Sequence, residues 1–225
     1  MRRITVLLAE DHTIVREGFR KMLELDADLE VVGEAENGRQ AVVLVKKLRP
    51  AVVVMDIAMP LLNGLEATRQ ILKAVPNTRI LILSAHSDGA YIKNATESGA
   101  VGFLLKQASA RVLSEGIREV NKGHTFFSPF IAKLLPKGER KLLGRAGRPK
   151  PRNSDLTSRE MELLQLIAEG NANKQAAAEL GVGMKTVERH REHLMKKLNI
   201  HGIARLTRYA IGAGIIESSV QLTIV

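Results

Sequence analysis

Apolar residues recur along the first half of the chain in two alternating patterns. One pattern is a short, nearly unbroken apolar run, which suits a strand buried on both faces of a sheet. Such runs predict strands at Ile4–Ala9, Val31–Glu34, Val52–Asp56, Arg79–Ser84 and Gly102–Leu105. The strand that ends at Asp56 must stop by the proline that follows shortly after it, because proline cannot donate to a strand ladder.

The second pattern places apolar residues three and four positions apart, as on one face of an amphipathic helix. It predicts a helix through Ala41–Leu48, and further helices over His12–Glu24, Leu65–Val75, Asp88–Ser98 and Ser109–Asn121. Strands and helices that alternate in this way form right-handed βαβ units around one parallel sheet. We therefore predict an α/β domain with a doubly wound, five-stranded parallel sheet in the flavodoxin-like order 2-1-3-4-5.

From Ser154 onward the pattern is helical throughout. Thr157 is followed three residues later by Glu160, which is typical of a capping box at a helix start. The predicted helices are Arg159–Glu169, Asn173–Leu180, Lys185–Leu198 and Ile203–Ala210. Two short helices joined by a turn that contains a glycine fit a helix-turn-helix, whose second helix enters the major groove of DNA.

Charge and composition separate the two halves. Residues 133–152 hold eight basic residues, one acidic residue and several Gly and Pro, which predicts a flexible cationic linker. We therefore expect a domain at 1–125, a linker at 126–153 and a smaller all-α domain at 154–225. Residues 131–225 carry 17 Lys+Arg and 9 Asp+Glu, a net charge of +8, whereas residues 1–130 carry 17 and 15, a net of +2. This imbalance favours nucleic acid as a partner.

Cysteine usage and hydropathy indicate the compartment. The chain has no cysteine, which excludes disulfides and thiolate metal sites and agrees with a reducing environment. No apolar stretch has the length needed to cross a bilayer, and the apolar run after Arg3 ends too soon, at Glu10, for a signal peptide. We expect a cytoplasmic protein with no membrane partner.

Residues that carry chemistry stand at the ends of the predicted strands, namely Glu10, Asp11, Asp56, Ser84 and Lys106. In a parallel sheet these ends meet on one rim, where open α/β sheets place their ligand sites. Three carboxylates there would repel one another, and Mg²⁺ would relieve the repulsion because it prefers carboxylate oxygens, water and phosphate. Asp56 could then accept a phosphoryl group as a nucleophile, while the metal and Lys106 neutralise the transferred oxygens and Ser84 donates to one of them.

These motifs resemble a known family. Glu10-Asp11, Asp56–Pro60 with Asn63-Gly64, Ser84-Ala85 and Gly102–Lys106 resemble the receiver domain of two-component response regulators, over about the first 125 residues. The resemblance implies that a partner sensor histidine kinase phosphorylates Asp56, with Mg²⁺ held by Glu10, Asp11 and Asp56. It also implies that Ser84 moves toward the phosphoryl group while Phe103, as the switch aromatic, rotates inward. A plain core aromatic is the alternative interpretation of Phe103.

The second half resembles the LuxR-type helix-turn-helix. The matching segments are Leu156–Glu160, Ile167–Gly170, Asn173-Lys174, Ala177–Leu180, Lys185–Val187, His190 and Lys197-Leu198. Together, the two halves resemble response regulators of the NarL/FixJ class.

The resemblance also suggests which residues touch DNA. By family position, the base edges would meet Glu188, Arg189 and Glu192, and the phosphates would meet Lys174, Lys185 and Thr186. The predicted DNA-binding set also includes Val187 and Lys196. Arg189 could bind guanine through two hydrogen bonds, and a glutamate could accept from cytosine. Ordinary helix-surface charge is the alternative for the two glutamates.

The combined expectation is a phosphorylation-controlled transcription regulator, with no enzymatic activity beyond its own phosphorylation and dephosphorylation. The expected partners are a sensor histidine kinase, an inverted-repeat operator in double-stranded DNA, and a second copy that forms a homodimer through Ile203–Ala210. Two alternatives stay open. One is a constitutive DNA-binding regulator whose receiver does not switch, and the other is a Mg²⁺-dependent phosphohydrolase with an aspartyl nucleophile.

Overall fold

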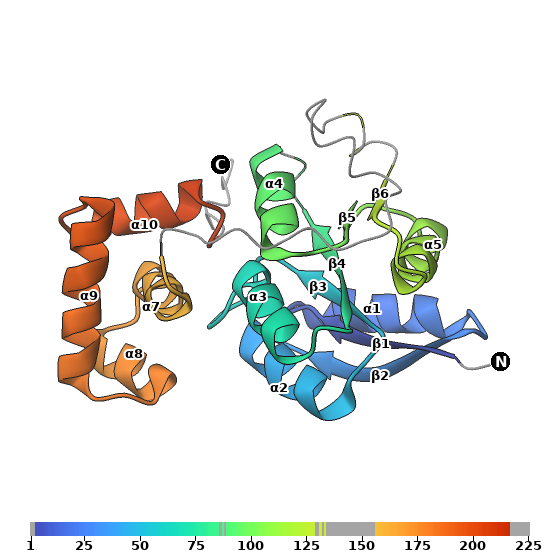
Figure 1. Cartoon of the computed structure of the whole chain (residues 1–225), viewed down its shortest axis with the longest axis horizontal. Helices are drawn as coiled ribbons and strands as arrows, with labels where there is room; N and C mark the ends of the chain where they lie inside the picture. Colours follow the sequence, from blue (N-terminus) through green and yellow to red (C-terminus); the bar gives the residue numbers. More distant parts are fainter. Residues whose placement is uncertain are drawn as a thin grey trace, which may run out of the picture. The chain divides into compact units, whose positions relative to one another are not determined.

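The chain folds into two compact units, Met1–Asn153 and Ser154–Val225, in a computed structural model (Figure 1). The structure describes residues 3–85, 87, 89–128, 131, 133 and 156–216. Most of the predicted linker, residues 126–153, lies outside the described residues.

The first unit is built on a parallel sheet of six strands in the order β2-β1-β3-β4-β5-β6. The strands are β1 Ile4–Ala9, β2 Leu29–Ala35, β3 Val52–Asp56, β4 Arg79–Ser84, β5 Gly102–Leu105 and β6 Phe126–Phe127. The first five strands and their order confirm the predicted doubly wound α/β fold. The sequence did not predict β6, which pairs with β5 beyond residue 125, because two residues are too few to show any periodicity.

Helices cover both faces of this sheet. They are α1 Thr13–Glu24, α2 Gly38–Leu48, α3 Gly64–Ala74, α4 Gly89–Ser98 and α5 Ala110–Asn121. Helices α2, α3 and α4 pack on one face, and α1 and α5 pack on the other. Successive β3 residues therefore point into two separate cores, Val53 and Met55 into one, Val52 and Val54 into the other. This double burial explains why the strand is apolar without alternation.

The loop after β3 folds back onto the end of that strand. Asn63 caps α3 by accepting a hydrogen bond from the Glu66 N–H at 2.9 Å, and the Gly64 N–H donates to the Ile57 carbonyl at 2.9 Å. A Cβ atom on Gly64 would lie 1.8 Å from the carbonyl oxygen of Asp56. Only glycine fits there, so this position helps to fix the backbone that carries Asp56.

The second unit is a bundle of four helices, α7 Ser158–Ala168, α8 Asn173–Leu180, α9 Met184–Leu198 and α10 Ile203–Gly212, among its described residues. The predicted capping box is present at the start of α7, where Thr157 and Glu160 bond reciprocally. Lys197 of α9 adds an ion pair to Glu160 at 2.8 Å, which ties the two helices together. The turn between α8 and α9 passes through Gly181 at φ +63°, a left-handed conformation that favours glycine.

Candidate functional site

The parallel register brings the predicted site residues to one rim of the sheet. Ala9 pairs with Met55, so Glu10 and Asp56, the residues that follow, leave neighbouring strands side by side. Asp56 pairs with Leu83, and Ser84 pairs with Leu105, so Ser84 and Lys106 end the next two strands on the same side. Glu10, Asp56 and Ser84 are each no more than 2% exposed. The carboxylates of Glu10 and Asp56 and the hydroxyl of Ser84 therefore lie in poorly solvated surroundings.

Lys106 joins the two buried carboxylates. Its Nζ atom lies 2.8 Å from Glu10 Oε2 and 2.9 Å from Asp56 Oδ2, and it donates a hydrogen bond to Glu10 Oε1 at 3.1 Å. The other Asp56 oxygen, Oδ1, accepts the Ile57 N–H at 2.8 Å. One ammonium group thus partly compensates two acids, and Asp56 is held from both sides.

Burial and neighbouring charges shift the pKa values of Asp56 and Lys106. The pKa of Asp56 rises to about 6, because burial disfavours the charged carboxylate and nearby Glu10 repels it, while Lys106 offsets part of the effect. Burial alone would lower the pKa of Lys106, but the charges of Asp56 and Glu10 outweigh it and raise that pKa. Lys106 therefore stays charged at neutral pH, and Asp56 becomes a carboxylate only above about pH 6 in the absence of another cation.

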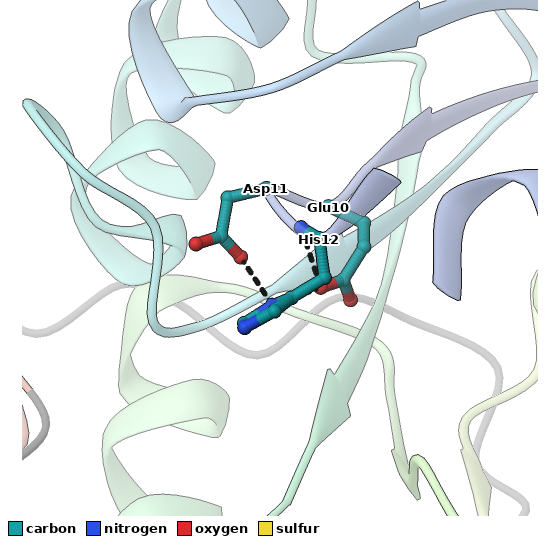
Figure 2. Close-up of side chains that lie close together, drawn as sticks. All are labelled: Glu10, Asp11 and His12. Atoms are coloured by element: carbon teal, nitrogen blue, oxygen red, sulfur yellow. Dashed lines mark hydrogen bonds and ion pairs between the residues drawn. The ribbon is translucent and has the colours of Figure 1, made fainter. Parts of the chain in front are cut away.

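Next to this pair, Glu10, Asp11 and His12 form a cluster of potential metal ligands, with one donor atom from each within 4.8 Å of the others. Figure 2 shows the His12 ring turned toward the acids, and its Nδ1 atom lies 2.9 Å from Glu10 Oε1 and 2.9 Å from Asp11 Oδ1. The hydrogen bond with Glu10, followed by the charge of Asp11, raises the pKa of His12. Asp56, the third predicted ligand, is not a member of this compact group, and Lys106 lies between it and Glu10.

The rim fits a hard cation, as its unsatisfied oxygens show. Glu10 Oε2, Asp11 Oδ1 and Asp56 Oδ2 are buried and accept no hydrogen bond within the described part of the chain. Lys106 and His12 approach them at ion-pair distances of 2.8 to 2.9 Å, without hydrogen-bond geometry. A Mg²⁺ ion binds such oxygens together with water, so the donor set is chemically suitable.

Ser84 and Phe103 lie where the sheet predicts. The backbone N–H of Lys106 donates to the Ser84 carbonyl at 2.9 Å, which holds the two strand ends together. Phe103 is fully buried, and it packs in the core that includes Ile92 and Ala95 of α4. Its ring is thus in contact with the α4 side of the sheet, the position from which an inward-packed aromatic can report on this rim.

In the second unit, α9 presents a charged, solvent-facing side. Six of the eight residues predicted to bind DNA are exposed, namely Lys174, Lys185, Glu188, Arg189, Glu192 and Lys196. Thr186 is half-buried. Val187 is fully buried together with Leu194, so it packs the helix against the bundle and is not available to touch DNA. The period of an α-helix explains this, because Val187 and Leu194 are two turns apart on its inner side.

Polar contacts fix α8 and α9 relative to each other within this unit. Arg191 donates to the side chain of Asn173 at 3.3 Å, and Arg159 of α7 donates to the Leu180 carbonyl at the end of α8. These bonds orient the helix-turn-helix without using the exposed charges of α9. The exposed side therefore remains free for a ligand.

Sequence reasoning did not identify two residues at the rim. His12 follows the acid pair directly, and this adjacency is a signal that could have suggested a third ligand. Arg16 is 6% exposed, and its Nη1 donates to the Glu10 carbonyl at 2.7 Å, while Glu34 and Glu36 bind its other nitrogens. Arg16 thus holds the backbone of the acid pair, a role that depends on contacts between distant segments and leaves no local pattern.

Comparisons with known proteins agree with both units. The family model described as response regulator receiver domain matches residues 6–118, and the one described as bacterial regulatory proteins, luxR family, matches residues 154–210. The transcriptional regulatory protein DegU of Brevibacillus brevis is 34% identical over 211 residues, which cover 88% of this chain and 89% of that protein. The oxygen regulatory protein NreC of Staphylococcus carnosus is 36% identical over 211 residues, which cover 92% and 96%.

Solved structures show the same relationship. The structure of the two-component response regulator RcsB–DNA complex is similar with a TM-score of 0.58 and 26% identity, covering 94% of this chain and 99% of that one. Within the described residues no helix has the length and apolar character of a membrane span. The chain therefore belongs to the two-component response regulators of the NarL/FixJ class, transcription regulators in which phosphorylation of a receiver domain controls a LuxR-type DNA-binding domain.

Proposed function

We propose that Asp56 is the phosphoacceptor of this regulator, and that a sensor histidine kinase supplies the phosphoryl group. The observation that carries this proposal is the shared contact of the Lys106 ammonium group with Asp56 at 2.9 Å and Glu10 at 2.8 Å, at the end of a fully buried strand. A lysine held in this way is placed to meet negative charge that develops beside Asp56.

The chemistry is a transfer between two nucleophiles. A carboxylate oxygen of Asp56 attacks the phosphorus of a phosphohistidine, a P–O bond forms as the P–N bond breaks, and the electron pair of that bond stays on the leaving imidazole. Lys106 moves its hydrogen bonds toward the transferred oxygens, and the Ser84 hydroxyl donates to one of them. Because the product adds about two negative charges at the rim, the balance of contacts around Lys106 and Phe103 changes.

Glu10, Asp11 and Asp56 are the residues that would hold Mg²⁺, with His12 beside them. When bound, the ion supplies charge neutralisation for the acids and for the phosphoryl oxygens. Arg16 keeps the backbone of Glu10 in place, and the Ile57 N–H keeps Asp56 oriented for attack.

We assign DNA binding to α9 and to residues that precede it. The exposed Arg189, Glu188 and Glu192 support contacts with base edges in the major groove, and Lys174 and Lys185 support contacts with phosphates. We propose that phosphorylation favours a homodimer whose two α9 helices read half-sites about one helical turn apart, through α10 as the contact surface. Ile203 and Tyr209, both partly exposed apolar residues of α10, support this choice.

A mobility-shift titration on genomic fragments tests the proposal, with and without prior phosphorylation by a histidine kinase. We expect phosphorylated wild type to bind its operator at least tenfold more tightly than the unmodified chain, which corresponds to a coupling of about 1.4 kcal/mol. Asp56→Asn should bind as the unmodified chain does under both conditions. Glu115→Gln, which removes an exposed acid of α5, serves as the control and should still respond.

Two other outcomes would change the assignment. Equal operator affinity of wild type and Asp56→Asn under both conditions would indicate a constitutive DNA-binding protein. Repeated turnover of a small phosphate ester, with more than one phosphate released per chain, would indicate a phosphohydrolase.

A further inference from the structure

Two adjoining cavities lie at the edge of the receiver sheet where the strands begin. Their volumes are about 480 Å³ and about 580 Å³, and Ala51, Asn77 and Asn121 line both of them. Ala51 directly precedes β3, the strand that ends at Asp56. Because the strands are parallel, these cavities lie at the opposite end of the sheet from the phosphorylation rim.

The lining of these cavities is basic. Arg79 lines the smaller cavity, and Arg3 and Arg49 line the larger one, whereas neither lining includes an Asp or a Glu among the described residues. Within the part of the chain that the structure describes, none of these three guanidinium groups forms an ion pair or a side-chain hydrogen bond. Three arginines thus line two adjoining cavities, with no acidic residue in either described lining.

Several arginines elsewhere in the unit have acidic partners, whereas the exposed Arg111 has none among the described residues. Acidic side chains lie within 3.3 Å of four of them, namely Arg16, Arg20, Arg69 and Arg118. Cations that lie near one another repel, and a bound anion relieves the repulsion beyond what water and salt already do. Arg3 and Arg49 are exposed and Arg79 is half-buried, so a dissolved anion can reach all three, and neither described lining contains an acid that would compete with it.

The end of α2 fixes the backbone at Arg49. Arg49 ends α2 in the left-handed conformation at φ +46°, which glycine or asparagine adopts at lower cost. Its N–H donates to the Val45 carbonyl at 2.9 Å, so the conformation is part of the helix cap. This helix cap therefore fixes the backbone of a residue that lines the larger cavity.

We propose that these two cavities form one binding site for a small polyanion, a molecule with two or more phosphate or carboxylate groups. The planar guanidinium groups of Arg3, Arg49 and Arg79 bind the anionic oxygens through paired hydrogen bonds. The amides of Asn77 and Asn121 add neutral donors between the cations. A cavity of this volume accommodates a small molecule.

Isothermal titration of the full chain with sodium pyrophosphate tests the proposal, at about 0.15 M salt and with no DNA present. We expect one site per chain with a Kd below about 1 mM. The double variant Arg49→Gln with Arg79→Gln should weaken binding by at least tenfold. Asn121→Asp, which places a negative charge in both cavities, should weaken it to a similar extent.

A charge-matched control separates this site from general attraction to a basic protein. Lys21→Gln with Arg111→Gln removes the same charge from two exposed residues outside the cavities, and its affinity should stay within twofold of wild type. In NMR spectra of the side-chain N–H groups, pyrophosphate should move the signals of Arg49 and Arg79. Equal weakening in the control pair, shifts centred on α9, or no binding by wild type would each overturn the proposal.

Discussion

At the scale of single residues, the burial of charged groups at the receiver rim is energetically unfavourable. Glu10 and Asp56 are both buried, and Lys106 is the cation that touches both of them. Burial of an ionised carboxylate is unfavourable unless its charge is compensated, and one ammonium group for two acids leaves the compensation incomplete. The rim is therefore less stable than a neutral one would be, and ready to take up a cation.

Asp56→Asn should stabilise the receiver unit at neutral pH. The pKa of Asp56 is raised to about 6, so its stabilising contribution is complete below about pH 4 and is lost as the pH rises through 6. A shift of about two pKa units corresponds to at most about 3 kcal/mol, so we expect a gain of about 1–3 kcal/mol in unfolding free energy at pH 7 and little change at pH 4. Urea unfolding without metal, followed by circular dichroism, measures this.

The matched control for that variant is Asp28→Asn. Asp28 is half exposed, and its hydrogen bonds with Arg118 lower its pKa, so its contribution is present above its unfolded pKa and is lost as the pH falls. Asp28→Asn should therefore lose stability at pH 7. If both variants moved in the same direction at pH 7, the electrostatic account of Asp56 would be wrong.

Lys106→Met should separate metal binding from phosphoryl transfer. The substitution removes the cation between Glu10 Oε2 and Asp56 Oδ2, so we expect Mg²⁺ to bind about tenfold more tightly. The rate of phosphorylation should fall by about 100-fold, because the ammonium donor is gone. Calorimetry suits the metal titration, since the chain has no tryptophan to report it. Lys122→Met, on an exposed lysine paired with Glu119, should change neither quantity.

At the scale of elements, turns and helix ends place the functional side chains. The loop after β3 holds Asp56 through the close approach of Gly64, and the turn after α8 depends on the left-handed Gly181. Helix α9 owes its position to Val187 and Leu194, which are fully buried, and its exposed side can therefore vary without disturbing the bundle. Sequence alone identified each of these elements, since periodicity and capping residues are local signals.

Gly64→Ala should impair phosphorylation although Asp56 itself is unchanged. The new Cβ atom would meet the Asp56 carbonyl oxygen at 1.8 Å, so the end of β3 must shift. We expect at least a tenfold slower phosphorylation by the kinase and a loss of several kcal/mol in stability, measured by phosphate incorporation and urea unfolding. Gly18→Ala, where a Cβ meets nothing within 4 Å in the exposed face of α1, should leave phosphorylation unchanged and raise stability by about 0.5–1 kcal/mol.

Gly181→Ala should destabilise the helix-turn-helix by about 1–2 kcal/mol, because alanine is strained at φ +63° although no neighbouring atom blocks it. Hydrogen exchange should show lower protection across α8 and α9. Gly212→Ala, at the last residue of α10, equally unobstructed and outside the left-handed region, should cause no loss of stability. Equal losses in the two variants would show that the left-handed turn is not the cause.

At the scale of the whole molecule, the basic excess of the second half is concentrated in one segment of the sequence. Residues 155–225 carry 9 Lys+Arg and 8 Asp+Glu, whereas residues 133–152 carry 8 and 1. This C-terminal segment is almost neutral, because its eight acidic residues, two of them in α9, offset its nine cations. General attraction to DNA phosphates is therefore expected mainly from the linker sequence, and selection among sequences from α9.

Two sets of substitutions should separate these effects. Replacing Arg145, Arg148, Lys150 and Arg152 with Gln should weaken binding to all DNA sequences and reduce the slope of log affinity against log salt by up to about four. The preference among operator variants should not change. Arg189→Ala should cost about 1–3 kcal/mol on the operator alone and relax the preference at one base pair. Fluorescence anisotropy over a salt series measures both quantities.

The sequence by itself determined the kinds of elements and the residues that end them. Alternating apolar patterns fixed the order of strands and helices, and their parallel arrangement placed Glu10, Asp56, Ser84 and Lys106 on one rim. These inferences succeeded because they depend on local periodicity and on the strong preference for right-handed βαβ units.

The tertiary structure alone decided which of those side chains touch. Lys106 reaches Glu10 across 96 positions of the chain, Arg16 holds the Glu10 carbonyl, and three arginines line two adjoining cavities at the far edge of the sheet. Such contacts depend on strand register, where a shift of one residue turns a side chain to the opposite face. No local pattern in a sequence encodes that register, so the charge balance at both ends of the sheet became visible only in three dimensions.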